Sequence, residues 1–203
     1  MPTHPRYDWG IAYYMSYDNN LDGFGAGIIA QIEEGIQSHN VVAAVQADFK
    51  QNNGMQRVTI TSKGKYRDVM ESEDSADVNQ VIAYLRWFIK RYPCRKYMVV
   101  FLDHGGKVDE MCNDGNPQTK GQYWISGHAL GQGLRAFRNR DNVPVELLFL
   151  QQCGRGSIEN LYSFRGTAEY VMSSPVNVGA PNTYYSKFTL WPQRLCAAAA
   201  EGL

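Results

Sequence analysis

The stretch Tyr97-Met-Val-Val-Phe-Leu-Asp-His104-Gly-Gly decides the fold together with a second one, Val145-Glu-Leu-Leu-Phe-Leu-Gln-Gln-Cys153-Gly. Each is an apolar run of strand length that ends on a reactive side chain and then on glycine. Open α/β sheets place their active sites outside the carboxyl ends of parallel strands. We therefore expect the imidazole and the thiol to emerge at one sheet edge, as a cysteine nucleophile with a histidine base requires.

Strands and helices alternate along the rest of the chain. Apolar runs predict strands at residues 9–15, 41–47, 57–61, 66–70 and 168–172, besides the two quoted above. Helical spacing or capping residues predict helices at 21–37, from Ser75 or Asp77 to Pro93, and at 126–138, 158–164 and 184–200. Residues 108–122 are polar and contain glycine, which is typical of a long loop. The alternation predicts an α/β fold, with a mainly parallel sheet of about six strands between two helical layers.

Composition bounds the class of protein. A chain of 203 residues with 44% hydrophobic residues is expected to form one domain, residues 1–203. Lys+Arg and Asp+Glu are both 20, so no basic face indicates nucleic acid or an anionic membrane as a partner. No apolar run reaches membrane-spanning length, and the first residues lack a signal peptide. The four cysteines are widely spaced, which disfavours a disulfide framework or a thiolate zinc site and favours a cytoplasmic location.

The glycines after the two reactive residues have a chemical use. Gly105 and Gly106 let backbone approach a substrate closely. The N–H groups of Gly105 and Cys153 are therefore candidates for an oxyanion hole. A neighbouring imidazole, from His104, and the amino end of a following helix both favour the thiolate of Cys153. A histidine or cysteine at a strand end is usually structural, but the matched pair favours a catalytic site.

Further blocks carry a resemblance to a known family. They are Tyr14-Met-Ser-Tyr-Asp-Asn-Asn-Leu-Asp-Gly, Arg86-Trp-Phe-Ile-Lys-Arg-Tyr-Pro, Cys112-Asn-Asp and Glu169-Tyr-Val-Met-Ser-Ser-Pro, in order around the two opening stretches. The chain resembles the clostripain-like cysteine peptidases of the caspase-like class, which includes gingipains, legumains and metacaspases. The resemblance implies a caspase-like three-layer sandwich, and protein or peptide substrates hydrolysed through an acyl-enzyme. It makes His104 and Cys153 the catalytic dyad. Asp103 is expected to point to the other side of its strand.

Substrate specificity departs from the family pattern. Clostripain-like enzymes have an aspartate two residues before the nucleophile, which binds an Arg or Lys side chain, whereas this chain has Gln151. Asp18, in the loop after the first strand, is expected to hold a basic P1 residue together with Gln151, or else to form an Asx turn. Ser173 and Ser174 either line the same pocket or form a turn at a strand end.

The resemblance also implies possible accessory features. Family members often cut themselves in the loop that follows the catalytic histidine, where Lys107 and Lys120 are the basic candidates. No cofactor is required for the chemistry, but some relatives need calcium. Asp109, Glu110 and Asp114 are candidate ligands, with solvated loop charges as the alternative. Oligomeric state is left open.

Two other functions remain as alternatives. Because Gln151 replaces the family's aspartate, the chain can be an inactive or weak peptidase fold that acts as a binding or regulatory module. A different thiol hydrolase on a doubly wound sheet is disfavoured, because Gln151-Gln-Cys-Gly-Arg lacks the first glycine of a nucleophile elbow.

Overall fold

A computed structural model describes residues 6–50, 54–117, 121–180 and 182–200, with side chains described as far as Gln193. The elements in chain order are β1 (Tyr7–Tyr17), α1 (Asp22–Gly35), β2 (Val41–Phe49), β3 (Gln56–Thr61), β4 (Gly64–Val69), α2 (Val78–Arg91), β5 (Cys94–Leu102), β6 (Glu110–Asn113), β7 (Trp124–Ser126), α3 (Gly127–Arg140), β8 (Val145–Gln151), α4 (Ile158–Ser163), β9 (Tyr170–Ser173) and α5 (Tyr185–Ala200).

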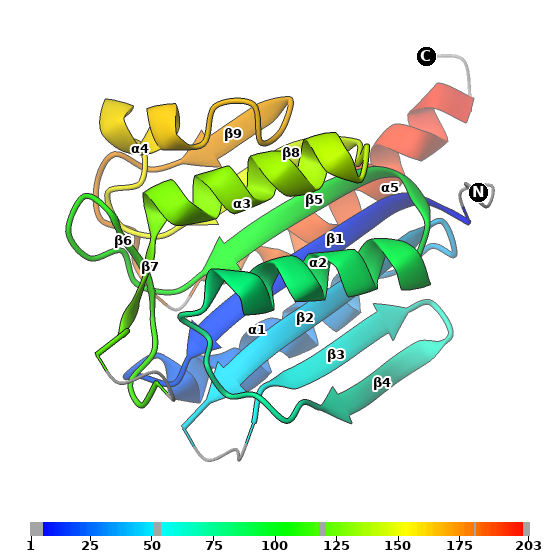
Figure 1. Ribbon diagram of the computed structural model, residues 1–203. Helices are drawn as coiled ribbons and strands as arrows, with labels where there is room; N and C mark the ends of the chain where they lie inside the picture. Colours follow the sequence, from blue (N-terminus) through cyan, green and yellow to red (C-terminus); the bar gives the residue numbers. More distant parts are fainter. Residues whose placement is uncertain (1–5, 51–53, 118–120, 181, 201–203) are drawn as a thin grey trace.

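The main sheet has seven strands in the order β4-β3-β2-β1-β5-β8-β9 (Figure 1). Strands β2, β1, β5, β8 and β9 are parallel, and the hairpin β3–β4 is antiparallel. The predicted α/β class and the mainly parallel sheet are confirmed, with a strand number close to the expected one. The register pairs Met15 with Leu102 and Leu102 with Gln151, so β1, β5 and β8 end side by side.

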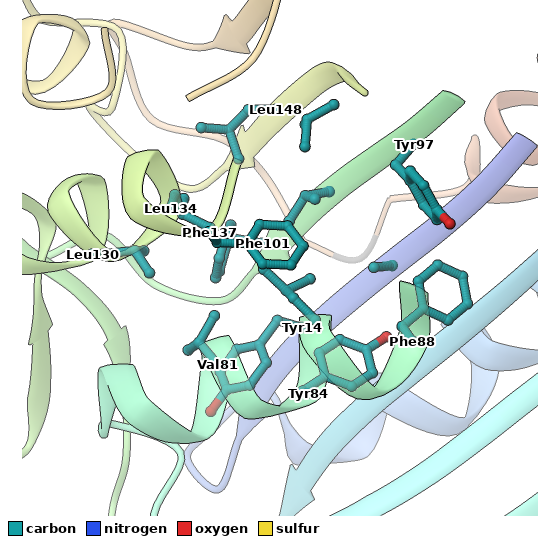
Figure 2. Close-up of a cluster of buried hydrophobic side chains, with 14 of the residues drawn as sticks. Tyr14, Val81, Tyr84, Phe88, Tyr97, Phe101, Leu130, Leu134, Phe137 and Leu148 are labelled. Carbon is teal, nitrogen blue, oxygen red and sulfur yellow. The ribbon is translucent and has the colours of Figure 1, made fainter. Parts of the chain in front are cut away.

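Helices α2 and α3 cover one face of the sheet and α1 and α5 the other (Figure 1). Figure 2 shows the first face, where sheet residues such as Tyr14, Phe101 and Leu148 pack against buried side chains of the two helices: Val81, Tyr84 and Phe88 of α2, and Leu130, Leu134 and Phe137 of α3. Their spacing of three and four residues places them on one helical face.

On the opposite face, the intervening residues of β1 point towards α1 and α5. Ile11 and Tyr13 are completely buried and pack with Ile32 of α1. Tyr13 and Thr189 of α5 share a hydrogen bond of 2.9 Å between their hydroxyl groups. Because alternate strand residues face opposite sides, a strand buried on both faces lacks charged and polar side chains along its buried length, as residues 9–15 of β1 do.

Capping residues fix where two helices begin. Asp77 accepts a hydrogen bond from the Asn79 N–H at 2.8 Å, so α2 is capped by the second of the two predicted residues. Ser126 accepts from the Ala129 N–H at 3.2 Å and caps α3. A side-chain oxygen at this position satisfies an amide that has no partner within the helix.

The predicted long loop at residues 108–122 is partly wrong, because it contains a strand. β6 pairs with β7 in a separate two-stranded antiparallel sheet. Met111 and Ile125 lie opposite each other in it and are completely buried. The strand is four residues long and lies in a polar segment, so its periodicity was too short to indicate it. Among the described residues, no helix is both long enough and apolar enough to cross a membrane.

Candidate active site

The ends of β5 and β8 bring the two predicted reactive residues to one pocket. His104 and Cys153 each lie two residues beyond the register pair Leu102–Gln151. Both line a pocket whose wall is otherwise formed largely by aromatic, aliphatic and amide side chains: Tyr17, Leu21, Phe24, Ile28, Asp103, Gln151, Gln152, Val178, Gly179, Ala180, Asn182 and Tyr185. The pocket lies at the sheet edge that parallel strands make available to a ligand.

Asn20 orients the imidazole of His104. The Asn20 Oδ1 atom lies 2.7 Å from the Nε2 atom of the half-buried ring. An amide oxygen only accepts hydrogen bonds, so Nε2 carries the hydrogen and Nδ1 is left as the basic nitrogen of the neutral ring. Burial lowers the pKa of His104 from its usual value of 6.5, which favours this neutral form. The sequence analysis assigned no role to Asn20.

The thiol of Cys153 is covered by the segment that follows β9. The Val178 N–H donates to Sγ at 3.3 Å, and Sγ lies 3.7 Å from the Val178 carbonyl oxygen. The Gly154 N–H donates to the Val176 carbonyl at 3.2 Å. Among the described residues, the hydrogen-bond partner of the thiol is therefore Val178, and no hydrogen bond joins the thiol to His104.

Gly105 makes close backbone packing between the two strand ends possible. A Cβ atom at this position would lie 2.2 Å from the carbonyl oxygen of Cys153 and 3.0 Å from Nε of Arg155. Any side chain here would therefore push the two loops apart. In the described part of the chain, the N–H groups of Gly105 and Cys153 form no backbone hydrogen bond. The bridge between Gly105 and Met111 uses the amides of Gly106 and Cys112 instead.

Arg155 fastens the loop after His104 to the loop around Cys153. Its side chain is only 2% exposed. The guanidinium donates to one side-chain oxygen, of Asn160, and to five backbone carbonyls, those of Cys153, Gly106, Lys107, Val108 and Glu110, at 3.0–3.4 Å. The sequence analysis missed this role, because nothing around Arg155 in the sequence separates it from a surface arginine.

Asp103 and Gln152 form further hydrogen bonds among the loops that carry His104 and Cys153. Asp103 accepts hydrogen bonds from the side chain of Asn19 at 2.8 Å and from the backbone N–H of Asn113. Its carboxylate therefore joins the loop after β1 to the end of β6. Burial raises the pKa of Asp103 well above the usual range. The Nε2 atom of Gln152 donates to the His104 carbonyl at 3.1 Å. These contacts fix the backbone that carries the imidazole.

The predicted substrate-binding residues are only partly brought together. Gln151 lines the pocket, and its Oε1 atom accepts a hydrogen bond from the Tyr185 hydroxyl. Asp18 does not line the pocket and is 4% exposed. Ser173 and Ser174 are also outside the pocket wall, and the Ser174 hydroxyl bonds the Val176 backbone, as in a turn at a strand end.

The predicted calcium ligands are separated as well. Asp109 accepts hydrogen bonds from the Ser126 hydroxyl at 2.6 Å and from the His128 N–H at 2.7 Å, so it stabilises the start of α3. Glu110 accepts from the backbone N–H of Lys107 at 2.9 Å. Asp114 instead lies beside Asp18 and Asp48, with a carboxylate oxygen of each within 4.8 Å of the others. Lys120, one predicted self-cleavage residue, lies outside the described residues.

Comparison with known proteins places this geometry in context. The sequence profile described as the clostripain family matches residues 13–192. Comparison with curated protein sequences gives no match. Two similar structures are a secreted C11 cysteine protease from Bacteroides thetaiotaomicron in complex with an irreversible peptide inhibitor, and an inactive zymogen C11 protease from Parabacteroides distasonis. Their TM-scores are both 0.69, with sequence identities of 22% and 20%.

A third similar structure, of a secreted C11 cysteine protease from Bacteroides thetaiotaomicron called iotapain, has a TM-score of 0.71 at 14% identity. These alignments cover 89%, 92% and 92% of this chain, but only 52%, 53% and 57% of the other chains. The chain therefore spans about half the length of these three structures.

Proposed function

Because the chain belongs to the clostripain family of cysteine peptidases, we propose that it is a cysteine endopeptidase in which Cys153 is the nucleophile and His104 the base. The observation that carries this proposal is the shared pocket: two side chains 49 positions apart in the sequence line one cavity at the ends of adjacent parallel strands. A thiol with a neighbouring imidazole is the arrangement that nucleophilic catalysis requires.

The proposed reaction has two stages. Nδ1 of His104 takes the proton from Cys153, and Sγ attacks the scissile carbonyl carbon. The N–H groups of Gly105 and Cys153 stabilise the oxyanion. The imidazolium then gives its proton to the leaving amine as the C–N bond breaks, which leaves a thioester. A water molecule, deprotonated by the same imidazole, attacks the thioester and releases the acid and the thiol.

Asn20 acts as a positioning residue in this scheme. Its amide oxygen, 2.7 Å from Nε2 of His104, holds the tautomer in which Nδ1 is free to accept a proton. Asp103 is not part of a triad, because its carboxylate is bonded to Asn19 and Asn113.

The described conformation corresponds to a latent enzyme in this proposal. The segment at residues 176–178 engages both the Cys153 thiol and the Gly154 N–H, and a substrate must displace it. Self-cleavage in the loop after His104 is one way to release such contacts, although Lys107, the basic candidate there, does not fit the neutral P1 class inferred below. An inactive zymogen among the similar structures supports the existence of a latent state in this family.

P1 recognition rests on the pocket wall near Gln151. A basic P1 residue was expected from Asp18, but Asp18 lies outside the pocket. The carboxylate that lines the pocket is that of Asp103, whose two oxygens already accept hydrogen bonds. The other polar groups of the wall are neutral and include the amides of Gln151 and Asn182 and the hydroxyl of Tyr185. We therefore infer a preference for a neutral P1 side chain that forms hydrogen bonds over Arg or Lys.

A fluorogenic peptide panel that varies P1 tests these proposals on the wild type, Cys153→Ala and His104→Ala. Activity in the wild type and loss of at least about a thousandfold in both variants is expected. Unchanged hydrolysis in Cys153→Ala would refute the nucleophile, and preference for Arg or Lys would refute the inferred P1 class.

The second candidate function is a binding module without peptidase activity. It is favoured by the Val178 backbone, which occupies the hydrogen-bonding positions of the thiol. The same panel separates the two functions, since a binding module retains peptide affinity, measured by fluorescence anisotropy, but shows no turnover by wild-type protein.

A further inference from the structure

The outer face of the small β6–β7 sheet lines an open groove of about 690 Å³. Met111 and Ile125 lie opposite each other in this sheet, and both side chains are completely buried. Glu110 and Ser126, which form the next pair, line the groove together with Trp124. Because successive residues of a strand point to opposite faces, one face of the small sheet packs on the core and the other is available to a ligand.

The groove begins one residue beyond the proposed oxyanion hole. A Cβ atom added to Gly106 would lie 2.6 Å from Oε2 of Glu110 and 3.2 Å from Cη2 of Trp124, so both side chains lie directly against this glycine. Its neighbour Gly105 packs against the carbonyl oxygen of Cys153. The loop after β5 therefore connects the reactive pocket with the groove.

The reactive pocket and the groove border opposite faces of the main sheet. Leu21 and Ile28 line the reactive pocket and belong to the core cluster on the side of α1 and α5. Met111 and Ile125, beneath the groove, belong to the cluster on the side of α2 and α3. In the proposed reaction His104 protonates the leaving amine, so the primed residues pass over the loop that carries it. A peptide with its P1 side chain in the reactive pocket therefore continues across the sheet edge towards the groove.

Acidic and aromatic side chains give the groove its chemistry. Two acidic and two aromatic residues line it: Asp109, Glu110, Tyr123 and Trp124. Among the described residues of the wall there is no arginine or lysine. A carboxylate beside aromatic faces is an environment that favours the cation of a basic side chain.

The cations near the two carboxylates leave them accessible. Glu110 pairs with Lys107 at 3.6 Å between Oε1 and Nζ, but the lysine side chain is 88% exposed, so this ion pair is weak and readily replaced. Asp109 accepts its hydrogen bonds from uncharged groups, the Ser126 hydroxyl and the His128 N–H. Among the described residues, neither carboxylate forms a salt bridge with a buried guanidinium.

We propose that this groove binds the primed side of the substrate and prefers Lys or Arg at P2′ or P3′. P1′ carries the leaving amine and lies beside His104, whereas the groove begins two residues further along the chain, at Gly106. Oε1 of Glu110 pairs with the cation of the peptide, and the rings of Tyr123 and Trp124 contact it. The role in substrate binding rests on the proposed function, whereas binding of a basic peptide in the groove does not.

The first test measures peptide binding in a Cys153→Ala background, which prevents turnover and self-cleavage. Two peptides represent the primed side, Ac-Ser-Arg-Arg-Ala-NH₂ and Ac-Ser-Gln-Gln-Ala-NH₂. Each is titrated while the indole N–H signal of Trp124, assigned by its absence in Trp124→Phe, is followed by NMR. The arginine peptide is expected to shift this signal with a Kd roughly fivefold lower than that of the glutamine peptide, as one exposed charge pair and one cation–π contact allow.

Variants of the groove test the assigned residues. Glu110→Gln is expected to reduce the ratio of the two dissociation constants to within about twofold, because the charge pair is lost. Glu146→Gln is the matched control and is expected to keep the full ratio, since Glu146 is also paired with a lysine and its side chain is 29% exposed, against 30% for Glu110. Tyr123→Leu removes a ring that is 50% exposed and is expected to lower the ratio to about half. If Glu110→Gln does not fold, Tyr123→Leu decides.

Equal affinity for the two peptides, or no shift of the Trp124 signal at millimolar peptide, would overturn the proposal. A full ratio in folded Glu110→Gln would overturn the assigned partner of the cation.

The second test measures hydrolysis by the wild type. Internally quenched peptides with Arg at P2′ or P3′ are expected to be cleaved with a kcat/KM roughly fivefold higher than those with Gln there. Cleavage without this preference would overturn the role of the groove in substrate binding. Absence of all cleavage, with the binding ratio intact, would contradict the proposed function and leave the binding site standing.

Discussion

Replacement of Arg155 by lysine tests how the two loops of the proposed active site are held together. Arg155 is 2% exposed and donates to five backbone carbonyls and to Asn160. A lysine ammonium keeps the charge but has three donors, so at least two of the five carbonyls lose their partner. Each buried polar group left unsatisfied destabilises the fold by about 1–3 kcal/mol. We therefore expect Arg155→Lys to lower the free energy of unfolding by roughly 2–6 kcal/mol.

Urea unfolding followed by circular dichroism measures this change. Arg86→Lys is the matched control, because Arg86 is half-exposed and forms a single ion pair with Asp141 at 3.0 Å. Its expected effect is below about 1 kcal/mol. Because Arg155 bonds the Cys153 carbonyl, the rate of Cys153 alkylation is expected to change in Arg155→Lys and not in Arg86→Lys. An unfolding free energy within about 1 kcal/mol of the wild type, with unchanged alkylation, would refute the reasoning.

Four further predictions concern the proposed active site. Asn20→Ala is expected to lower kcat by roughly 10–100-fold with little change in KM, because the imidazole loses its orienting acceptor; an unchanged kcat counts against this role. The acid limb of the pH profile of kcat/KM is expected to have its midpoint below 6.5, since burial lowers the pKa of His104 and the neutral ring is the base; a midpoint above 6.5 contradicts this. Gly105→Ala is expected to destabilise the fold by more than about 1 kcal/mol, measured by urea unfolding, because its Cβ would lie 2.2 Å from the Cys153 carbonyl oxygen. Gln151→Asp is expected to raise hydrolysis after Arg relative to neutral P1 residues in a peptide panel, because it adds a carboxylate to the pocket wall; an unchanged preference excludes Gln151 from P1 recognition.

The sequence predicted the sheet and the meeting of His104 and Cys153 for a simple physical reason. Long apolar runs that end on glycine are strong local signals, and parallel strands bring their carboxyl ends to one edge. Positions 102 and 151 are register partners, so His104 and Cys153, two residues further on, lie at one pocket.

The loops could not be predicted in the same way. The position of Asp18 depends on its contact with Gly115, nearly one hundred residues later in the chain, and not on local spacing. Arg155 bonds backbone carbonyls, which leave no trace in the sequence. Cover of the thiol by Val178 also arises from tertiary packing. A side chain that forms hydrogen bonds with backbone groups far away in the sequence produces no periodic pattern. Its role can therefore be identified only from the folded structure.

The most direct test of the central claim is site-mapped labelling by a peptidyl acyloxymethyl ketone. Burial raises the pKa of Cys94 to about 12, and Cys112 is completely buried, so neither is expected to react. The side chain of the fourth cysteine, Cys196, lies beyond the described side chains, so labelling is done in a Cys196→Ser background. We predict one adduct per chain, mapped to Cys153 by mass spectrometry, absent in Cys153→Ala and formed at least about tenfold more slowly in His104→Ala. An adduct on another cysteine, or a labelling rate that His104→Ala leaves unchanged, would contradict the account.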